Sequence, residues 1–178
     1  MSAARTHNLA DLFEGAADEL STQDAVVAGG HGVDAVRLSY ADLDRRANRV
    51  ANHLSGLGVK AGDHVAVHLT NRSEFLEVLL GTFKLRAVPV NANFRYTVDE
   101  LRQVFDDAEV TAVITEVDGH MDLAERAAAA AGDGPIVRVG DDYEGAWPPP
   151  PRDRTAASDR AMTSTCSTQA APRACPKA

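Results

Sequence analysis

The fold is decided by residues 64–91, which read HVAVHLTNRSEFLEVLLGTFKLRAVPVN. The first run, His64-Val-Ala-Val-His-Leu69, has the residue types of a β-strand. The last run, Ala87-Val-Pro-Val-Asn91, is a second short strand, in which Pro89 indicates a sheet edge or a bulge. Two strands joined by a helix need a crossover connection, and such a connection predicts parallel pairing.

The helix expected between these strands is nearly all apolar from Phe75 to Phe83. A helix of this kind is expected to be buried on most sides. Asn71 and Glu74, three residues apart, are expected to form its capping pair.

The same alternation of β-prone runs and amphipathic helices continues on both sides of this stretch. The expected elements are a helix from Asn8, a glycine-turned hairpin over 24–39, a helix after the N-cap Ser39, a helix after the capping box of Thr97 and Glu100, a strand over 111–115, a helix over 121–131 and a strand over 136–139. Four strands separated by helices predict an α/β fold, with a largely parallel sheet and helices on both faces.

Composition excludes several classes of function. The formal charge is −8 and no segment carries a run of Lys and Arg, so nucleic acid is not an expected partner. No apolar run approaches the length of a bilayer span, and no signal peptide is expected. The two cysteines, Cys166 and Cys175, leave the body without a disulfide framework, which favours a cytoplasmic location.

Residues 147–178 differ in character from residues 1–146. Four prolines occupy 148–151, and beyond them the chain has no large aliphatic or aromatic residue apart from Met162. The tail also holds 5 of the 18 basic residues but only 2 of the 26 acidic ones, which reverses the sign of the charge. A segment that cannot build a core is expected to be disordered, so two regions are predicted, with the boundary at 146/147.

Five segments of the first region carry a family resemblance when they are taken together. They are Asn8-Leu-Ala-Asp-Leu-Phe13, Leu38-Ser-Tyr-Ala-Asp-Leu43, Asn48-Arg-Val-Ala-Asn-His-Leu54, Gly58-Val-Lys-Ala-Gly-Asp63 and Phe83-Lys-Leu-Arg-Ala-Val-Pro-Val-Asn91. In this order and spacing the chain resembles the amino-terminal part of AMP-forming acyl-CoA synthetases, in the adenylate-forming superfamily.

The resemblance implies an enzyme that activates a carboxylic or fatty acid with ATP and Mg, then transfers the acyl group to coenzyme A. In that family the phosphate loop and the catalytic segments come later in the chain, and none of them appears in this sequence. We therefore expect no catalytic, cofactor-binding or metal-binding residue here, no cofactor for this chain, and no activity of the chain alone.

The missing phosphate loop is present in another reading frame. If each codon is read from the third base of the codon before it, residues 167–178 can encode Leu-Tyr-Thr-Gly-Gly-Thr-Thr-Gly-Met-Pro-Lys-Gly, which is the family's signature. An accidental match has roughly one chance in five per position, or on the order of one in 10^8 overall. A coding shift near Ala146 and Trp147 is therefore expected.

Two candidate sites favour structural interpretations. Gly29-Gly-His-Gly32 could cradle a phosphate, but its place between two β-prone runs favours a hairpin turn. His64 and His68 share one face of a strand and could share a metal, but no third ligand is near, so two solvent-facing histidines are expected.

The other candidates are also expected to be structural or surface groups. In Asn93-Phe-Arg-Tyr96 the aromatic rings are expected to pack and Arg95 to lie at the surface. The pairs Asp106-Asp107 and Asp141-Asp142 are expected to be solvated, because adjacent carboxylates do not converge on one atom. Cys175 and Lys177 lack the neighbours that would make them a nucleophile or a phosphate ligand.

Two functions of different classes remain open. One is an acyl-CoA synthetase fragment that is inert alone, and the other is a free-standing α/β module that binds a nucleotide or a protein. Exposed sheet edges would also allow self-association.

Overall fold

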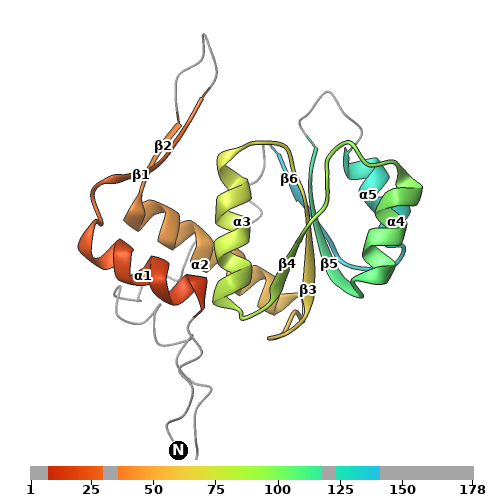
Figure 1. Cartoon of the computed structure of the whole chain (residues 1–178), viewed down its shortest axis with the longest axis horizontal. Helices are drawn as coiled ribbons and strands as arrows, with labels where there is room; N and C mark the ends of the chain where they lie inside the picture. The colour runs from red at the N-terminus through yellow and green to blue at the C-terminus, as the bar shows by residue number, and fades with distance from the viewer. Residues whose placement is uncertain (1–7, 30–35, 118–122, 141–178) are drawn as a thin grey trace, which may run out of the picture.

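The computed structural model describes residues 8–29, 36–117 and 123–140. The helices are α1 (Leu9–Glu19), α2 (Tyr40–Gly56), α3 (Ser73–Lys84), α4 (Val98–Asp107) and α5 (Leu123–Ala131), and the strands are β1 (Asp24–Ala28), β2 (Val36–Ser39), β3 (His64–His68), β4 (Val88–Asn91), β5 (Val110–Glu116) and β6 (Ile136–Val139). Each element expected from the sequence is found, within a few residues of its predicted bounds (Figure 1). The tail, residues 147–178, for which disorder was expected, lies outside the described ranges.

Four strands form one parallel sheet in the order β4-β3-β5-β6. Among the described residues β4 is an edge strand, which agrees with the interpretation of Pro89, since a proline has no N–H to give to a second neighbour. β1 and β2 form a separate antiparallel hairpin, also as expected. The carboxyl ends of the parallel strands lie together at the top of Figure 1.

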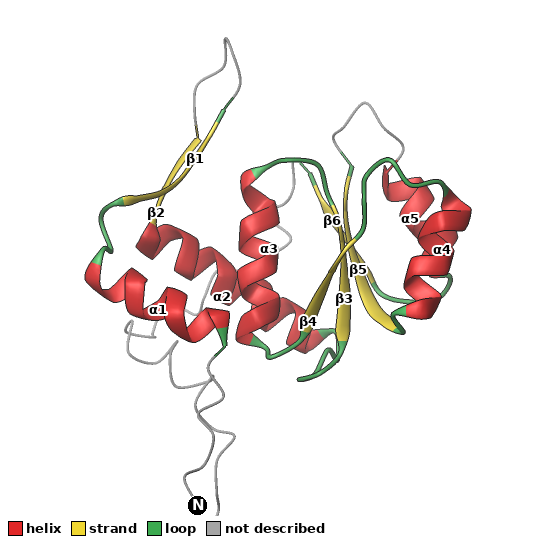
Figure 2. Ribbon diagram, viewed as in Figure 1, coloured by secondary structure: helices red, strands yellow, loops and turns green. Residues whose placement is uncertain are grey.

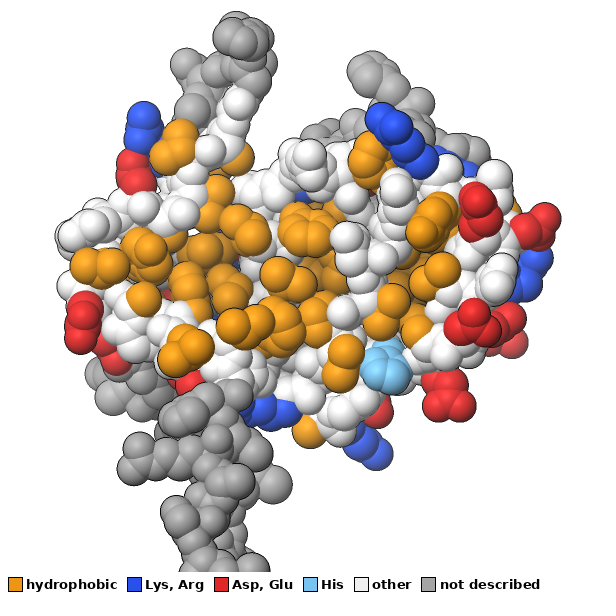
Figure 3. All heavy atoms as spheres, viewed as in Figure 1, with side chains coloured by type: hydrophobic (Ala, Val, Ile, Leu, Met, Phe, Trp, Pro, Cys, Tyr) orange, Lys and Arg blue, Asp and Glu red, His pale blue; other side chains and the backbone are white. Residues whose placement is uncertain are grey.

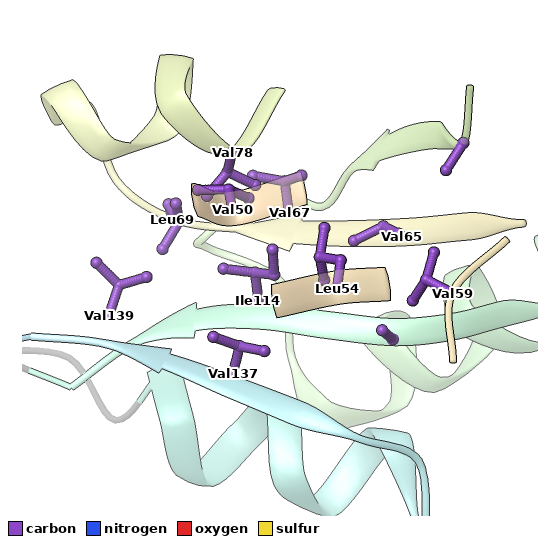
Figure 4. Packing of buried hydrophobic residues seen from close by; sticks show 12 residues of the cluster. Val50, Leu54, Val59, Val65, Val67, Leu69, Val78, Ile114, Val137 and Val139 are labelled. Carbon is purple, nitrogen blue, oxygen red and sulfur yellow. The ribbon is translucent and has the colours of Figure 1, made fainter. Parts of the chain in front are cut away.

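Helices cover both faces of the parallel sheet, with α2 and α3 on one side and α4 and α5 on the other (Figure 2). On the α2/α3 face, Val65, Val67 and Ile114 form one cluster with Leu54 and Val78 (Figure 4). Full burial of each such aliphatic side chain contributes about 1.5 to 3 kcal/mol.

The α4/α5 face has a second cluster with smaller residues on its strands. Ala66 and Val113 of the sheet pack with Leu101 and Phe105 of α4 and with Ala127 of α5. The two-sided cover explains why β3 and β5 are buried along nearly their whole length.

Capping boxes begin three of the helices. Ser39 and Thr97 each accept a hydrogen bond from the backbone three residues on and are capped in return, as expected. Asn8 caps α1 in the same way, and its side-chain amide donates to the carbonyl oxygen of Phe83 at 2.7 Å. The expectation for α3 is wrong, because its N-cap is Arg72 and not Asn71.

Arg72 caps α3 without a side-chain hydrogen bond to the helix backbone. Its guanidinium instead donates to Glu74 at 2.8 Å. Burial alone would raise the pKa of Glu74, but this bond and the charge of Arg72 hold that pKa below its ordinary value. With Arg72 as its N-cap, the helix starts one residue later than its sequence pattern indicates.

Burial on α3 also differs from the prediction. The helix buries Glu77, Thr82 and Lys84, while Leu76 is 38% exposed. Apolar side chains gather on the surface over α1, α3 and β4 (Figure 3), where Leu9, Leu12 and Val88 are also exposed. The apolar residues of α3 are thus only partly used by the core of the described residues.

The two charged residues buried on α3 find their partners on α1 and α2. Lys84 forms ion pairs with Glu14 of α1 and with Asp44 of α2, the latter at 2.9 Å, and Glu77 pairs with Arg46 of α2 at 3.3 Å. Gly81 lets α2 and α3 approach closely, because a Cβ there would lie 2.6 Å from the Cβ of Val50 and 2.8 Å from the carbonyl oxygen of Ala47.

Candidate functional site at the carboxyl edge of the sheet

The chain leaves the neighbouring strands β3 and β5 toward opposite faces of the sheet. α3 follows β3 on one face, whereas α5 follows β5 on the other. At such a switch point the connecting loops diverge, and open α/β sheets bind ligands there. The polar residues gathered at this end are called the carboxyl-edge cluster, and they are His68, Thr70, Arg72, Thr115, Glu116 and Arg126.

His68 is fully buried at the end of β3, which corrects the expectation that it faces solvent. Strand alternation directs its side chain to the face that α4 and α5 cover, so a position opposite the apolar residues is not an exposed one. Its Nδ1 lies 3.3 Å from Oγ1 of Thr115, and its Nε2 is buried without a hydrogen-bond partner among the described residues.

Two causes lower the pKa of His68 to about 4. The larger is burial, and the second is the positive charge of Arg126, which together outweigh the opposing charge of Glu116. His68 is therefore neutral at ordinary cellular pH.

His64 lies at the other end of the same strand and does not join this cluster. It is half-buried, and its Nδ1 is within hydrogen-bond distance of the carbonyl oxygen of Ala108. The two histidines therefore do not form a shared site.

Glu116 joins the ends of β3 and β5. Its carboxylate accepts hydrogen bonds from the backbone N–H of Thr70 at 3.0 Å and from the hydroxyl of Thr70 at 2.9 Å. Nη1 of Arg72 lies 3.7 Å away. With its side chain only 3% exposed, Glu116 is a paired structural carboxylate and is poorly placed to act as a general base.

Arg126 connects α5 to the loop between β4 and α4. Its guanidinium donates to the carbonyl oxygen of Tyr96 at 2.6 Å and to that of Phe94 at 3.2 Å. A planar fork bound to two carbonyls fixes the backbone on both sides of Arg95. The cluster thus connects the carboxyl ends of β3 and β5 to the loop that follows β4.

The described residues provide no metal centre. Within 8–29, 36–117 and 123–140, no group of three or more His, Cys, Asp or Glu side chains is placed to hold a metal ion.

The remaining predicted positions have mixed outcomes. Phe94 and Tyr96 are half-buried and Arg95 is exposed, as expected, and Asp106 and Asp107 lie at the surface. The turn from Gly30, the pair at 141–142, Cys175 and Lys177 lie outside the described residues.

The carboxyl-edge cluster is not among the sites expected from the sequence. Arg72, Glu116 and Arg126 belong to no motif and lie far apart in the chain. One signal was available, because Thr115 and Glu116 are polar residues that end an otherwise apolar strand.

Comparison with known proteins decides the family. The family model described as AMP-binding enzyme matches residues 13–174. The chain belongs to the AMP-binding enzyme family. No helix of the described residues is both long and apolar enough to cross a membrane.

Relatives of this family member are CoA ligases of bacteria. A medium/long-chain-fatty-acid–CoA/3-oxocholest-4-en-26-oate–CoA ligase of Mycobacterium tuberculosis is 39% identical over 132 residues, which cover 74% of this chain and 22% of the ligase. A 3-oxocholest-4-en-26-oate–CoA ligase of Rhodococcus rhodochrous is 38% identical over 109 residues, covering 61% of this chain and 19% of the ligase. The chain spans about a fifth of the length of these relatives.

Solved structures show the same fold for the described body of this AMP-binding family member. The N-terminal domain of FACL13 from Mycobacterium tuberculosis superposes with a TM-score of 0.64 at 27% identity, over 79% of this chain and 35% of that one. A putative long-chain-fatty-acid CoA ligase from Rhodopseudomonas palustris gives a TM-score of 0.66 at 27% identity, over 78% and 34%. The α/β prediction and the resemblance to the amino-terminal part of acyl-CoA synthetases are confirmed.

Proposed function

We propose that this chain supplies the amino-terminal part of an acyl-CoA synthetase that makes acyl-CoA, AMP and diphosphate from a carboxylic acid, ATP and coenzyme A. One observation carries the proposal: the family match over residues 13–174, which is accompanied by 39% identity to a fatty-acid CoA ligase. The acid is proposed to be a fatty or sterol-derived carboxylic acid, since those are the substrates named for the relatives.

The proposal includes that the chain alone is not catalytic. Attack of a carboxylate on the α-phosphate of ATP needs the triphosphate charge to be neutralised and held while the nucleophile approaches in line. Among the described residues, Glu116 of the carboxyl-edge cluster is already paired with Thr70 and Arg72, so it is not free to serve the reaction. Loss of one stabilising contact costs about 3 to 4 kcal/mol, and here several are missing together.

The same proposal extends to the cofactors, the reading frame and the self-association of the chain. ATP, Mg²⁺ and coenzyme A act in the longer protein, in the cytoplasm, and nucleic acid is no partner. The coding shift near Ala146 places residues 147–178 out of frame. Self-association of the chain occurs through the β4 edge and the exposed apolar side chains of α1 and α3.

The chain and a longer version of it test this function. The 178-residue chain should release no pyrophosphate when given ATP, Mg²⁺ and a fatty acid, whereas a gene with the frame corrected near Trp147 and continued to the length of the relatives should release it. Acid-dependent release by the short chain, absent from a mock purification, would overturn the claim of inactivity. Failure of the longer protein would overturn the proposed reaction.

The free-standing binding module is distinguished by affinity. Micromolar binding of labelled ATP by the 178-residue chain would favour that module over a synthetase part.

A further inference from the structure

A small pocket opens at the amino edge of the parallel sheet, at the opposite end from the carboxyl-edge cluster. This amino-edge pocket lies between α4, α5 and the start of β5, and it has a volume of about 80 Å³. Its lining includes Phe105, Asp106, Thr111, Ala112, Ala130 and Gly134. A drug-sized ligand needs a cleft of roughly 300 to 1,000 Å³. The pocket therefore suits one small group, larger than a water molecule.

Two helices end beside this pocket. α4 and α5 pack side by side, and each runs from the carboxyl edge to the amino edge, because each leads from one parallel strand to the next (Figure 2). α4 ends at Asp107 and α5 at Ala131, so residues of both last turns line the pocket. The last carbonyl groups of a helix have no partner within it and carry partial negative charge. Both helix ends therefore make the pocket favourable for a positive charge.

The side chains at this edge add negative charge and do not neutralise the helix ends. Neither α4 nor α5 has a basic residue in its last turn. α4 ends in the exposed residues Asp106 and Asp107, although acidic groups are unfavourable near a helix C-terminus. The carboxylate of Asp106 lines the pocket and has no hydrogen-bond or ion-pair partner in the described part of the chain. Asp106 is thus available to a cation from outside.

Donors from other positions already reach carbonyl groups of these helix ends. Nη2 of Arg102 donates to the carbonyl oxygen of Ala129 at 3.3 Å, and Nδ1 of His64 lies within hydrogen-bond distance of that of Ala108. Arg102 and His64 themselves are not part of the pocket lining. The helix ends therefore accept N–H donors on both sides of the pocket, while the pocket itself is lined by no Lys or Arg among the described residues.

We propose that the amino-edge pocket binds a primary ammonium group, with the carboxylate of Asp106 as its ion-pair partner. An ammonium group is compact and has three N–H donors and no acceptor, so it matches a wall of carboxylate and carbonyl oxygens. Two sources present this group: a free aliphatic amine, and the side chain of a lysine in a partner protein. The inference does not depend on the proposed function, because the pocket lies at the other end of the sheet.

NMR of the 178-residue chain tests the pocket. Butylammonium and Nα-acetyl-lysine methylamide are titrated separately at constant ionic strength, and the amide signals of Asp106, Thr111, Ala112 and Gly134 are followed. These signals should move in a saturable way, with millimolar affinity, for at least one probe. A stronger response to butylammonium would identify a free amine as the ligand, and a stronger response to the lysine derivative would identify a lysine side chain. Tetramethylammonium, which has the same charge but no N–H donor, should give no saturable shift.

Three variants separate the pocket from the general charge of α4. Asp106→Asn should weaken the ammonium affinity about fivefold, as expected for one solvent-accessible ion pair. Asp107→Asn is the matched control, because it removes the neighbouring surface charge outside the pocket lining and should change the affinity less than about twofold. Ala131→Leu fills the pocket without a change of charge and should abolish the saturable shifts. If Ala131→Leu unfolds, the two aspartate variants still decide the question.

The inference is overturned if neither ammonium probe gives a saturable shift, or if tetramethylammonium gives the same shifts. It is also overturned if Asp106→Asn and Asp107→Asn weaken the affinity equally, because the cation would then be attracted by the charge of α4 and not by the pocket. Pyrophosphate release by the longer protein, which judges the proposed function, is a separate measurement and is unaffected by any of these outcomes.

Discussion

The two faces of the parallel sheet bury polar groups in opposite ways. On the α2/α3 face the strand residues of the core cluster are apolar, and the helix α3 brings the buried charges Glu77 and Lys84. On the α4/α5 face the helix residues of the core cluster are apolar, and the strands bring the buried polar side chains His68 and Thr115. The buried charges of α3, Glu77 and Lys84, meet partners from other helices, while on the opposite face Nε2 of His68 has no hydrogen-bond partner among the described residues.

The hydrophobic content of a helix or strand therefore does not by itself predict which of its sides faces the interior. α4 follows the simple rule and buries Leu101 and Phe105. α3 has more apolar residues, yet it also buries the charges Glu77 and Lys84 where it meets α1 and α2. The two faces should therefore respond differently to substitution.

The largest effect is expected when the buried cation of α3 is removed. Lys84→Met leaves Glu14 and Asp44 without their shared partner, and an uncompensated charge of this kind should lower the free energy of unfolding by about 4 kcal/mol. Urea unfolding measures it. On the other face Arg102→Met, which breaks a surface pair, should change stability by less than about 0.5 kcal/mol. Equal losses in the two variants would break the comparison.

Truncation of an apolar side chain should lower the free energy of unfolding more on α4 than on α3. Leu101→Ala removes a fully buried side chain and should cost about 3 kcal/mol, whereas Leu76→Ala, at a position 38% exposed, should cost less than about 1 kcal/mol. Thermal and urea unfolding of both variants give the numbers. A larger loss for the Leu76 variant would mean that the surface of α3 is covered in solution.

The buried histidine should make the α4/α5 face sensitive to acid. Because the pKa of His68 is about 4 in the folded chain and near 6.5 when unfolded, the unfolded chain takes up its proton first as the pH falls. Stability from this residue is complete above pH 6.5 and declines between 6.5 and 4, by about 2 to 3 kcal/mol in all. The check is urea unfolding at a series of pH values.

His68→Leu is the control for this titration, because it fills the position with an apolar side chain and removes the proton site. Other groups also lose stability in acid, including Asp42, whose pKa is lowered by the Ser39 hydroxyl. The difference between the parent and His68→Leu is therefore the informative quantity. A pH-independent difference would show that His68 does not titrate as proposed.

The smallest effect is expected at the N-caps of α3 and α4. Thr97→Ala removes the cap of α4 and should cost about 1 kcal/mol. Asn71→Ala should be nearly neutral, because Arg72, and not Asn71, is the N-cap of α3. Chemical denaturation of the two variants compares them, and a loss near 1 kcal/mol for Asn71→Ala would restore the cap expected from the sequence.

The sequence by itself determined the order and type of the elements, because their signals are local. A capping box such as Thr97 and Glu100 is complete within four residues, and an edge strand can be read from the missing N–H of Pro89. The family could also be recognised from short ordered segments that needed no knowledge of three-dimensional contacts.

Only the tertiary structure decided which residues face the interior and which ones meet. Strand periodicity assigned His64 and His68 to one face but could not show that helices cover it. Lys84 and Glu14, or Arg126 and Phe94, lie many residues apart in the sequence, and their contacts arise from the packing of a helix against another helix or against a loop. A buried charge is stable only when its partner is in place, so its position depends on the whole fold and not on the local sequence.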